Sequence, residues 1–182
     1  GTNMSETSVF ESYCKSVNNL CAQMQNDKEE ISKDDAYLAR AYAESMPISK
    51  AGDVLLFCAS INLMNTYVKQ PGCKGFGYFF KSFVPRLIKQ IEDTPIEGVV
   101  CNTSMDKNST VTMVVVYGMQ FSFHCVKGAK KWITDTVIPF DGVRKQKCAS
   151  TIFKMAAANQ LLHSDWNPDS TESQRQFEAR RA

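Results

Sequence analysis

The stretch Thr110–Val126, TVTMVVVYGMQFSFHCV, decides the fold class. Its first half is dense in β-branched residues, which fit a pleated, half-buried surface. Gly118 separates Thr110–Tyr117 from Met119–Val126, and so short a connection between two strands allows only an antiparallel hairpin. The sequence therefore predicts a hairpin at the centre of the fold.

Alternation along the second strand of this hairpin predicts one apolar and one polar face. The apolar set, expected in the core, is Met119, Phe121, Phe123 and Cys125. The polar set is Gln120, Ser122 and His124. The polar row is interpreted in three ways: as a solvated sheet face, as a binding surface, or as the setting of a catalytic His124, because histidine titrates near neutral pH.

Further strands extend the hairpin on both sides. Val99 and Val100 begin a β-branched run that a turn at 106–108 connects to Thr110, and the segment Trp132–Ile138 is expected to add another strand. We therefore expect a central antiparallel hairpin or meander of about three to four strands.

Helices are predicted before the strands, in the segments 8–24, 32–46, 49–70 and 76–91. Ser8 and Ser32 provide N-terminal capping signals, and Pro47 stops the second helix. Pro85 is expected to kink the fourth helix, because proline removes a backbone donor.

A long C-terminal helix is predicted to open at 139–142 and to continue to Leu162. Residues 164–182 are polar apart from Trp166 and Phe177, and they are interpreted as a loose tail or a marginal helix. Residues 1–3 precede Met4 and look like a cloning remnant. The sequence thus predicts a single α+β domain over residues 4–163.

Composition places the chain among globular proteins, with 182 residues, 43% hydrophobic and 22% charged. It shows neither a secretion signal nor an apolar run long enough for a membrane span, so we expect a cytoplasmic protein with no membrane partner. The 7 cysteines form no C-x-x-C pair, which favours free thiols in a reducing compartment. We expect no metal and no cofactor.

Basic residues gather at the predicted start of the last helix, although the net charge is only +2. Arg144, Lys145 and Lys147 lie where the helix dipole disfavours cations, and free backbone N–H groups there attract anions. Lys127, Lys130 and Lys131 precede them in the chain. The cluster is interpreted as a site for phosphates or an acidic surface, or as a solvated basic helix end.

A glycine-rich stretch, 72–77, lacks the Gly-Lys-Ser/Thr ending of a phosphate loop. Residues 74–79, KGFGYF, resemble the ribonucleoprotein octamer of RNA-recognition motifs, which stacks bases on aromatic rings. Phe79 and Lys81 depart from that pattern, and helices rather than strands are predicted upstream. An aromatic helix start after a glycine turn is therefore the favoured interpretation.

Two segments, 117–124 (YGMQFSFH) and 140–146 (FDGVRKQ), resemble the short accessory proteins of phages and mobile elements. The resemblance implies an anti-defence role, such as that of an anti-CRISPR protein, as one hypothesis for the function. It implies action by binding and assigns no catalytic residue.

Three functions are therefore compared. The leading hypothesis is a non-enzymatic protein that binds nucleic acid or a nucleoprotein through the polar row and the basic residues. The second is a small metal-independent ribonuclease with His124 as general base. The third is a regulator that binds a protein through an exposed aromatic stretch at 76–83. The sequence leaves the oligomeric state open.

Overall fold

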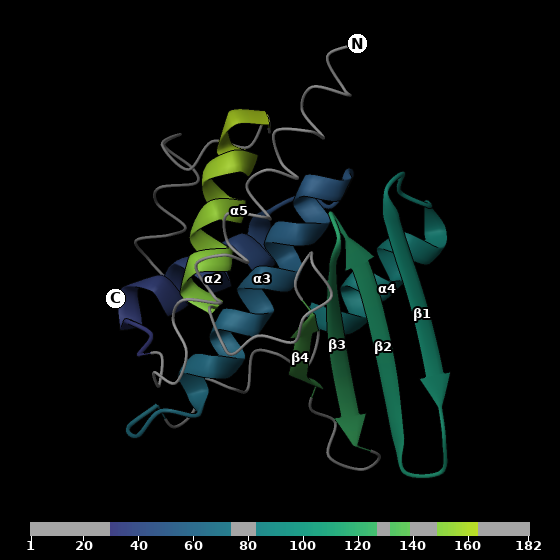
Figure 1. Ribbon diagram of the computed structural model, residues 1–182, viewed down its shortest axis with the longest axis horizontal. Coiled ribbons are helices and arrows are strands. Elements are labelled where there is room, and N and C mark those ends of the chain that lie inside the picture. The colour runs from purple at the N-terminus through teal and green to yellow at the C-terminus, as the bar shows by residue number, and fades with distance from the viewer. Residues whose placement is uncertain (1–29, 74–82, 127–131, 139–148, 164–182) are drawn as a thin grey trace.

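The computed structural model describes residues 30–73, 83–126, 132–138 and 149–163. In this part of the chain, four helices and one antiparallel sheet form an α+β arrangement (Figure 1). Helix α3 lies between the sheet and the pair α2 and α5, and it contacts both helices as well as strands β2 and β4. The predicted helix at 8–24 and the predicted tail at 164–182 lie outside the described residues.

Helix α2 covers Lys33–Ser45 and confirms the second predicted helix. Its N-cap is Ser32, whose Oγ accepts a hydrogen bond from the backbone N–H of Asp35 at 3.1 Å. The helix ends at the C-cap Met46, directly before Pro47. The start and stop signals in the sequence are thus the ones the structure uses.

Helix α3, Ala51–Val68, is buried along most of its length and confirms the third predicted helix. A buried carboxylate holds its start. Asp53 accepts hydrogen bonds from the backbone N–H of Ser49 at 3.0 Å and from that of Lys50 at 3.1 Å. The Ser49 hydroxyl adds a third bond at 3.0 Å. These bonds satisfy donors that the helix start would otherwise leave unpaired.

Helix α4 covers Phe83–Asp93 and buries Phe83, Val84 and Leu87. Arg86, on the same helix, donates to the backbone carbonyls of Ala43 and Met46 at the end of α2. A cation is favoured there because the C-terminal carbonyls form the negative end of the helix dipole. Burial lowers the pKa of Arg86. The predicted kink at Pro85 depends on residues 76–82, which the structure does not describe.

Helix α5 covers Ala149–His163. Its Phe153 ring meets that of Tyr42 edge-on, with centroids 5.9 Å apart, which fixes α5 against α2. The longer C-terminal helix predicted from residue 139 is not supported, because residues 139–148 lie outside the described part of the chain.

The sheet is an antiparallel meander in the order β1-β2-β3-β4, with strands Val99–Met105, Ser109–Val116, Met119–Val126 and Trp132–Ile138. The residues between β2 and β3 have positive φ angles, 48° at Tyr117 and 75° at Gly118. Two consecutive residues with positive φ are typical of a type I′ turn, whose twist matches that of the strands. The predicted hairpin is confirmed.

The core face of the sheet agrees with the alternation of the sequence. Met119, Phe121 and Phe123 are buried, and Val114 and Val116 lie beside them from β2. Cys125 is only half-buried, so the predicted core set is right except at its last member. Strand alternation leaves the intervening residues on the opposite face.

Cysteines 58, 73, 101 and 125 are free thiols, as predicted. Cys58 is buried, and its burial raises the pKa of the thiol. Among the described helices, none combines the length and the apolar character that crossing a membrane requires.

Candidate binding face of the sheet

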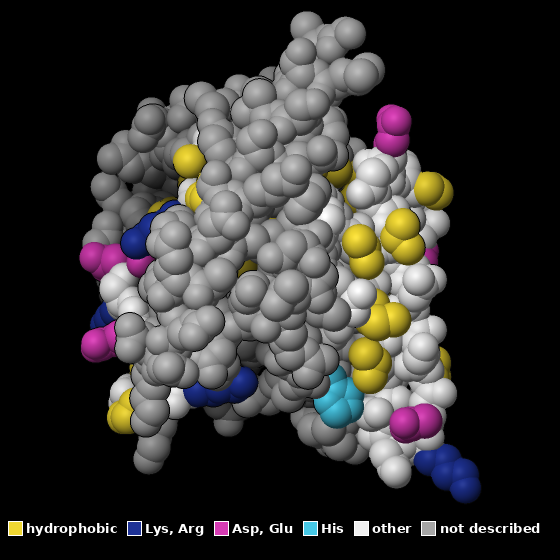
Figure 2. Space-filling view, viewed as in Figure 1, with side chains coloured by type: hydrophobic (Ala, Val, Ile, Leu, Met, Phe, Trp, Pro, Cys, Tyr) yellow, Lys and Arg dark blue, Asp and Glu magenta, His cyan; other side chains and the backbone are white. Residues whose placement is uncertain are grey.

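The side of the sheet turned away from the buried rings carries a regular grid of nine side chains, called here the outer sheet face. Its members, in cross-strand rows, are Val100–Val115–Gln120, Asn102–Met113–Ser122 and Ser104–Val111–His124. Directly opposite residues of antiparallel strands share a face, so the register alone assembles this grid. Figure 2 shows hydrophobic side chains gathered over this part of the sheet.

Each strand contributes a different kind of side chain to the outer sheet face. β2 contributes an apolar column, β3 contributes the polar row, and β1 adds Val100 and two small polar residues. No lysine, arginine, aspartate or glutamate lies within strands β1, β2 and β3. The nine residues contributed by these three strands therefore form an uncharged surface with an apolar centre.

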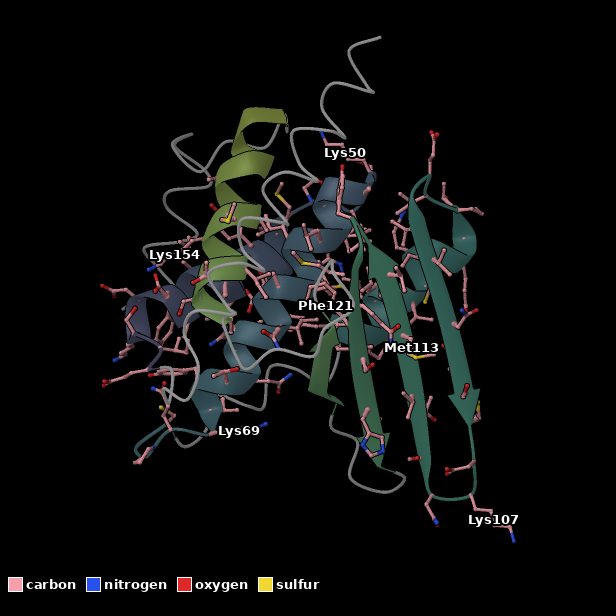
Figure 3. The ribbon with its side chains drawn as sticks, in the orientation of Figure 1. Lys50, Lys69, Lys107, Met113, Phe121 and Lys154 are labelled. Carbon is pink, nitrogen blue, oxygen red and sulfur yellow. The ribbon has the colours of Figure 1, made fainter. Side chains whose placement is uncertain are left out.

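Gln120, Ser122 and His124 share this face, as the sequence predicts, and all three are half-buried rather than freely solvated. The Gln120 side-chain amide donates to Met113 Sδ at 3.3 Å, which ties the polar row to the apolar column. Figure 3 labels Met113 on the outer face and Phe121 on the core face.

His124 lies at the end of the grid near the turn between β1 and β2. In that turn, Asp106 accepts hydrogen bonds from the backbone N–H groups of Asn108 and Ser109, at 2.7 Å each. These bonds lower the pKa of the Asp106 carboxyl, and His124 contributes the smallest part of the shift. The hydrogen bonds thus favour the ionised form of Asp106.

General base catalysis by His124 would need a cation to stabilise a phosphate in the transition state. The cations that the sequence suggested for this role are Lys127, Lys130, Lys131 and Arg144, which all lie outside the described residues. No three described His, Cys, Asp or Glu residues lie together as a metal ion would require. The ribonuclease hypothesis stays a prediction.

The basic residues at the predicted helix start, Arg144, Lys145 and Lys147, also fall outside the residues that the structure describes. Their convergence with the polar row is therefore untested. Lys154 follows them in the sequence and lies on α5. Its Nζ is 3.6 Å from Asp35 Oδ2, so this lysine has an acidic partner within the protein.

The sequence segment that contains β4 is more basic than the rest of the chain. Residues 127–148 contain six lysines or arginines and two aspartates, a net charge of +4, whereas the whole chain carries +2. The rest of the chain is therefore net negative by two charges. This basic segment includes β4, which pairs with β3, the strand that carries the polar row.

Sequence reasoning missed the apolar column Val111, Met113 and Val115. In the run Val111–Val116, which is apolar except for Thr112, composition does not separate the two faces. Counting the alternation from Phe121 across the turn would have found the column. The register pairs Phe121 with Val114, so the odd-numbered residues of β2 lie on the outer face.

Phe83, from the aromatic stretch, is buried with its ring 6.3 Å from that of Phe57. The other aromatic residues of that stretch lie outside the described residues.

Comparison with known proteins gives no match: neither a family model, nor a curated protein, nor a solved structure resembles the chain significantly. The class of the protein is therefore defined by its fold and by this surface. It is an α+β protein whose antiparallel sheet packs one face on helices and carries an uncharged grid on the other.

Proposed function

We propose that the protein is a non-enzymatic binding protein that engages nucleic acid, alone or within a nucleoprotein complex. One observation carries the proposal: β3 aligns Gln120, Ser122 and His124 on the outer sheet face, and the sequence segment that contains its neighbour β4, 127–148, holds the excess positive charge of the chain.

The polar row and the basic residues have complementary chemistry. Amide, hydroxyl and imidazole groups hydrogen-bond to bases, sugars or polar protein groups, and cations bind phosphates in a way that does not depend on sequence. The uncharged apolar column beside the polar row suits contact with protein better than contact with a phosphate backbone. The combination favours a nucleoprotein over a bare duplex.

The proposal is of the binding class because the observation that carries it is a row of hydrogen-bonding side chains together with an excess of positive charge in the sequence. The anti-defence role implied by the resemblance is a proposal of the same kind, since such an inhibitor acts by occupying a nucleoprotein. A ribonuclease is tested in parallel by incubating structured RNA with the protein in chelator. Cleavage that disappears in His124→Ala would replace the binding proposal.

Binding is tested by fluorescence anisotropy with labelled RNA and DNA over a range of salt concentrations. The triple variant with Arg144, Lys145 and Lys147 changed to Ala should bind more weakly. Its slope of log affinity against log salt should be shallower by about 2 to 3, because each cation that binds a phosphate releases roughly 0.7 to 0.9 counterions.

The matched control removes three exposed lysines from the helical part of the molecule, Lys33, Lys69 and Lys89. This control changes the net charge equally and should leave the slope close to that of the wild type. Absence of nucleic-acid binding by the wild type, or equal salt slopes for the two triple variants, contradicts the proposal.

A further inference from the structure

The outermost strand of the described sheet, β1, and the start of β2 form a projecting arm, residues 102–110. Residues 102–108 are exposed without a break. Figure 1 shows that the turn of the arm lies beyond the described helices. Thr103 and Met105 follow the alternation of the core face, yet both are exposed, Met105 at 79%. The arm therefore offers its turn and both faces of β1 to a partner.

The side chains of the arm are mostly small hydrogen-bonding groups. Asparagine, serine and threonine fill six of its nine positions, and Met105 is its apolar member. Lys107 lies at the free end, where Figure 3 labels it. Aromatic residues and arginine, which are enriched in contacts between proteins, are absent from residues 102–110. The arm resembles the edges of bases in its chemistry, because the major groove presents donors, acceptors and the thymine methyl group.

An independent observation is the place of the basic segment in the sheet. Val126, the last residue of β3, pairs with Ser109 of the arm. Trp132, the first residue of β4, pairs with Cys125. The connection 127–131 contains three lysines and is therefore attached at both ends to the end of the sheet from which the arm projects.

The charges at this end of the sheet favour an anionic partner. The turn of the arm carries Lys107 and Asp106, and the connection 127–131 adds three lysines. The Asp106 carboxylate accepts hydrogen bonds from the backbone N–H groups of Asn108 and Ser109 in its own turn. An excess of positive charge beside a hydrogen-bonding arm matches the phosphates that flank a groove.

We propose that the arm enters the major groove of duplex DNA, with its turn toward the base edges. This inference rests on the proposed function, because it specifies the nucleic acid that the protein engages. Paired strands lie about 4.8 Å apart, and a two-stranded ribbon fits the major groove of B-form DNA, which is about 12 Å wide. The major groove of an RNA duplex is too deep and narrow for such contacts, so the arm selects DNA.

The choice of nucleic acid is tested by fluorescence anisotropy with a mixed-sequence DNA duplex and an RNA duplex of the same sequence. The wild type should bind the DNA duplex at least about tenfold more tightly. A second DNA duplex carries a bulky substituent at C5 of its pyrimidines, a position that faces the major groove and leaves the minor groove unchanged. The wild type should bind this duplex at least about tenfold more weakly than the unmodified one.

The role of the arm is tested with single variants on the unmodified DNA duplex. Lys107→Ala should weaken binding roughly fivefold to tenfold at about 0.1 M salt and make the salt slope shallower by about 1. Asp106→Asn should strengthen binding at least about twofold, because it removes a negative charge near phosphates. The matched control Lys69→Ala removes an exposed cation on the helical side of the molecule, labelled in Figure 3, and should leave affinity and slope unchanged. Circular dichroism checks that each variant is folded.

Failure of the arm and failure of the proposed function give different results. A wild type that binds no nucleic acid overturns both. A wild type that binds RNA as tightly as DNA, or that binds the C5-substituted duplex as tightly as the unmodified one, overturns only the inference about the arm. Equal affinities of Lys107→Ala and Lys69→Ala for the DNA duplex also overturn it, and they leave the arm as a surface for a protein.

Discussion

The two faces of the same sheet have different physical roles. Phe121 and Phe123 on the core face are 0% exposed and their rings stack with centroids 6.5 Å apart, whereas their neighbour Ser122 is half-buried on the outer face. Packing decides which residues are tolerated on the core face, because each buried ring removes a large apolar area from water. None of the nine residues of the outer sheet face is fully buried, so core packing constrains this face less.

The largest expected difference between the faces is measured at adjacent positions of β3. Phe121→Ala should lower the free energy of unfolding by about 3 to 5 kcal/mol, because it leaves a cavity in the core. Ser122→Ala should change it by no more than about 0.5 kcal/mol. Urea denaturation followed by circular dichroism measures both. Similar effects for the two variants would show that the outer face is also part of a packed core.

A smaller effect on the free energy of unfolding is expected at the turn between β2 and β3. Gly118 has a φ of 75°, a conformation that costs a residue with a Cβ about 1 to 2 kcal/mol. Gly118→Ala should therefore lower the free energy of unfolding by about 1 kcal/mol. Gly118→Asn should lower it less, because asparagine tolerates this region of backbone space better. Equal effects for the two variants would argue against the type I′ geometry.

The smallest effect concerns pH and the turn next to His124. The folded state lowers the pKa of Asp106, first through the N–H group of Asn108 and then through that of Ser109. A lowered folded-state pKa stabilises the protein above the ordinary carboxyl pKa of about 4, and this stabilisation is lost as the pH falls through the folded value. NMR should show the two amide protons titrating together with the carboxyl.

Asp106→Ala is the matched variant for this titration. Its amide resonances at residues 108 and 109 should lose the acid transition while the rest of the hairpin keeps its spectrum. An Asp106 carboxyl that titrates at its ordinary pKa in the folded wild type would mean that the turn is not formed as described.

Much of the fold was predictable because local signals agree with the tertiary structure. Ser32, Pro47 and Gly118 each mark a boundary through backbone chemistry that acts over a few residues. Most of the core set on β3 was predictable for the same reason, since alternation is a local rule. Cys125, near the end of the strand, departs from it and is half-buried.

The candidate site was predictable only in part. The polar row Gln120, Ser122 and His124 follows from alternation within one strand. The apolar column and the open edge at β1 depend on register between strands and on which strand is outermost, and neither property is encoded locally.

Arg86 shows the same limit in the helices. Its guanidinium binds carbonyls of α2 about forty residues earlier in the chain. No periodicity within α4 could indicate that contact. It arises because packing brings the start of α4 against the end of α2.

By itself, the sequence determined the approximate bounds of α2, α3 and the strands, the hairpin, and the face on which each residue of β3 lies. These features depend on backbone conformation and on side-chain alternation, which act between near neighbours. Only the tertiary structure decided that β1 is the open edge, that nine residues form the outer sheet face, and that Arg86 closes the end of α2. Those features depend on contacts between segments far apart in the chain, whose pairing is selected by packing of the whole core.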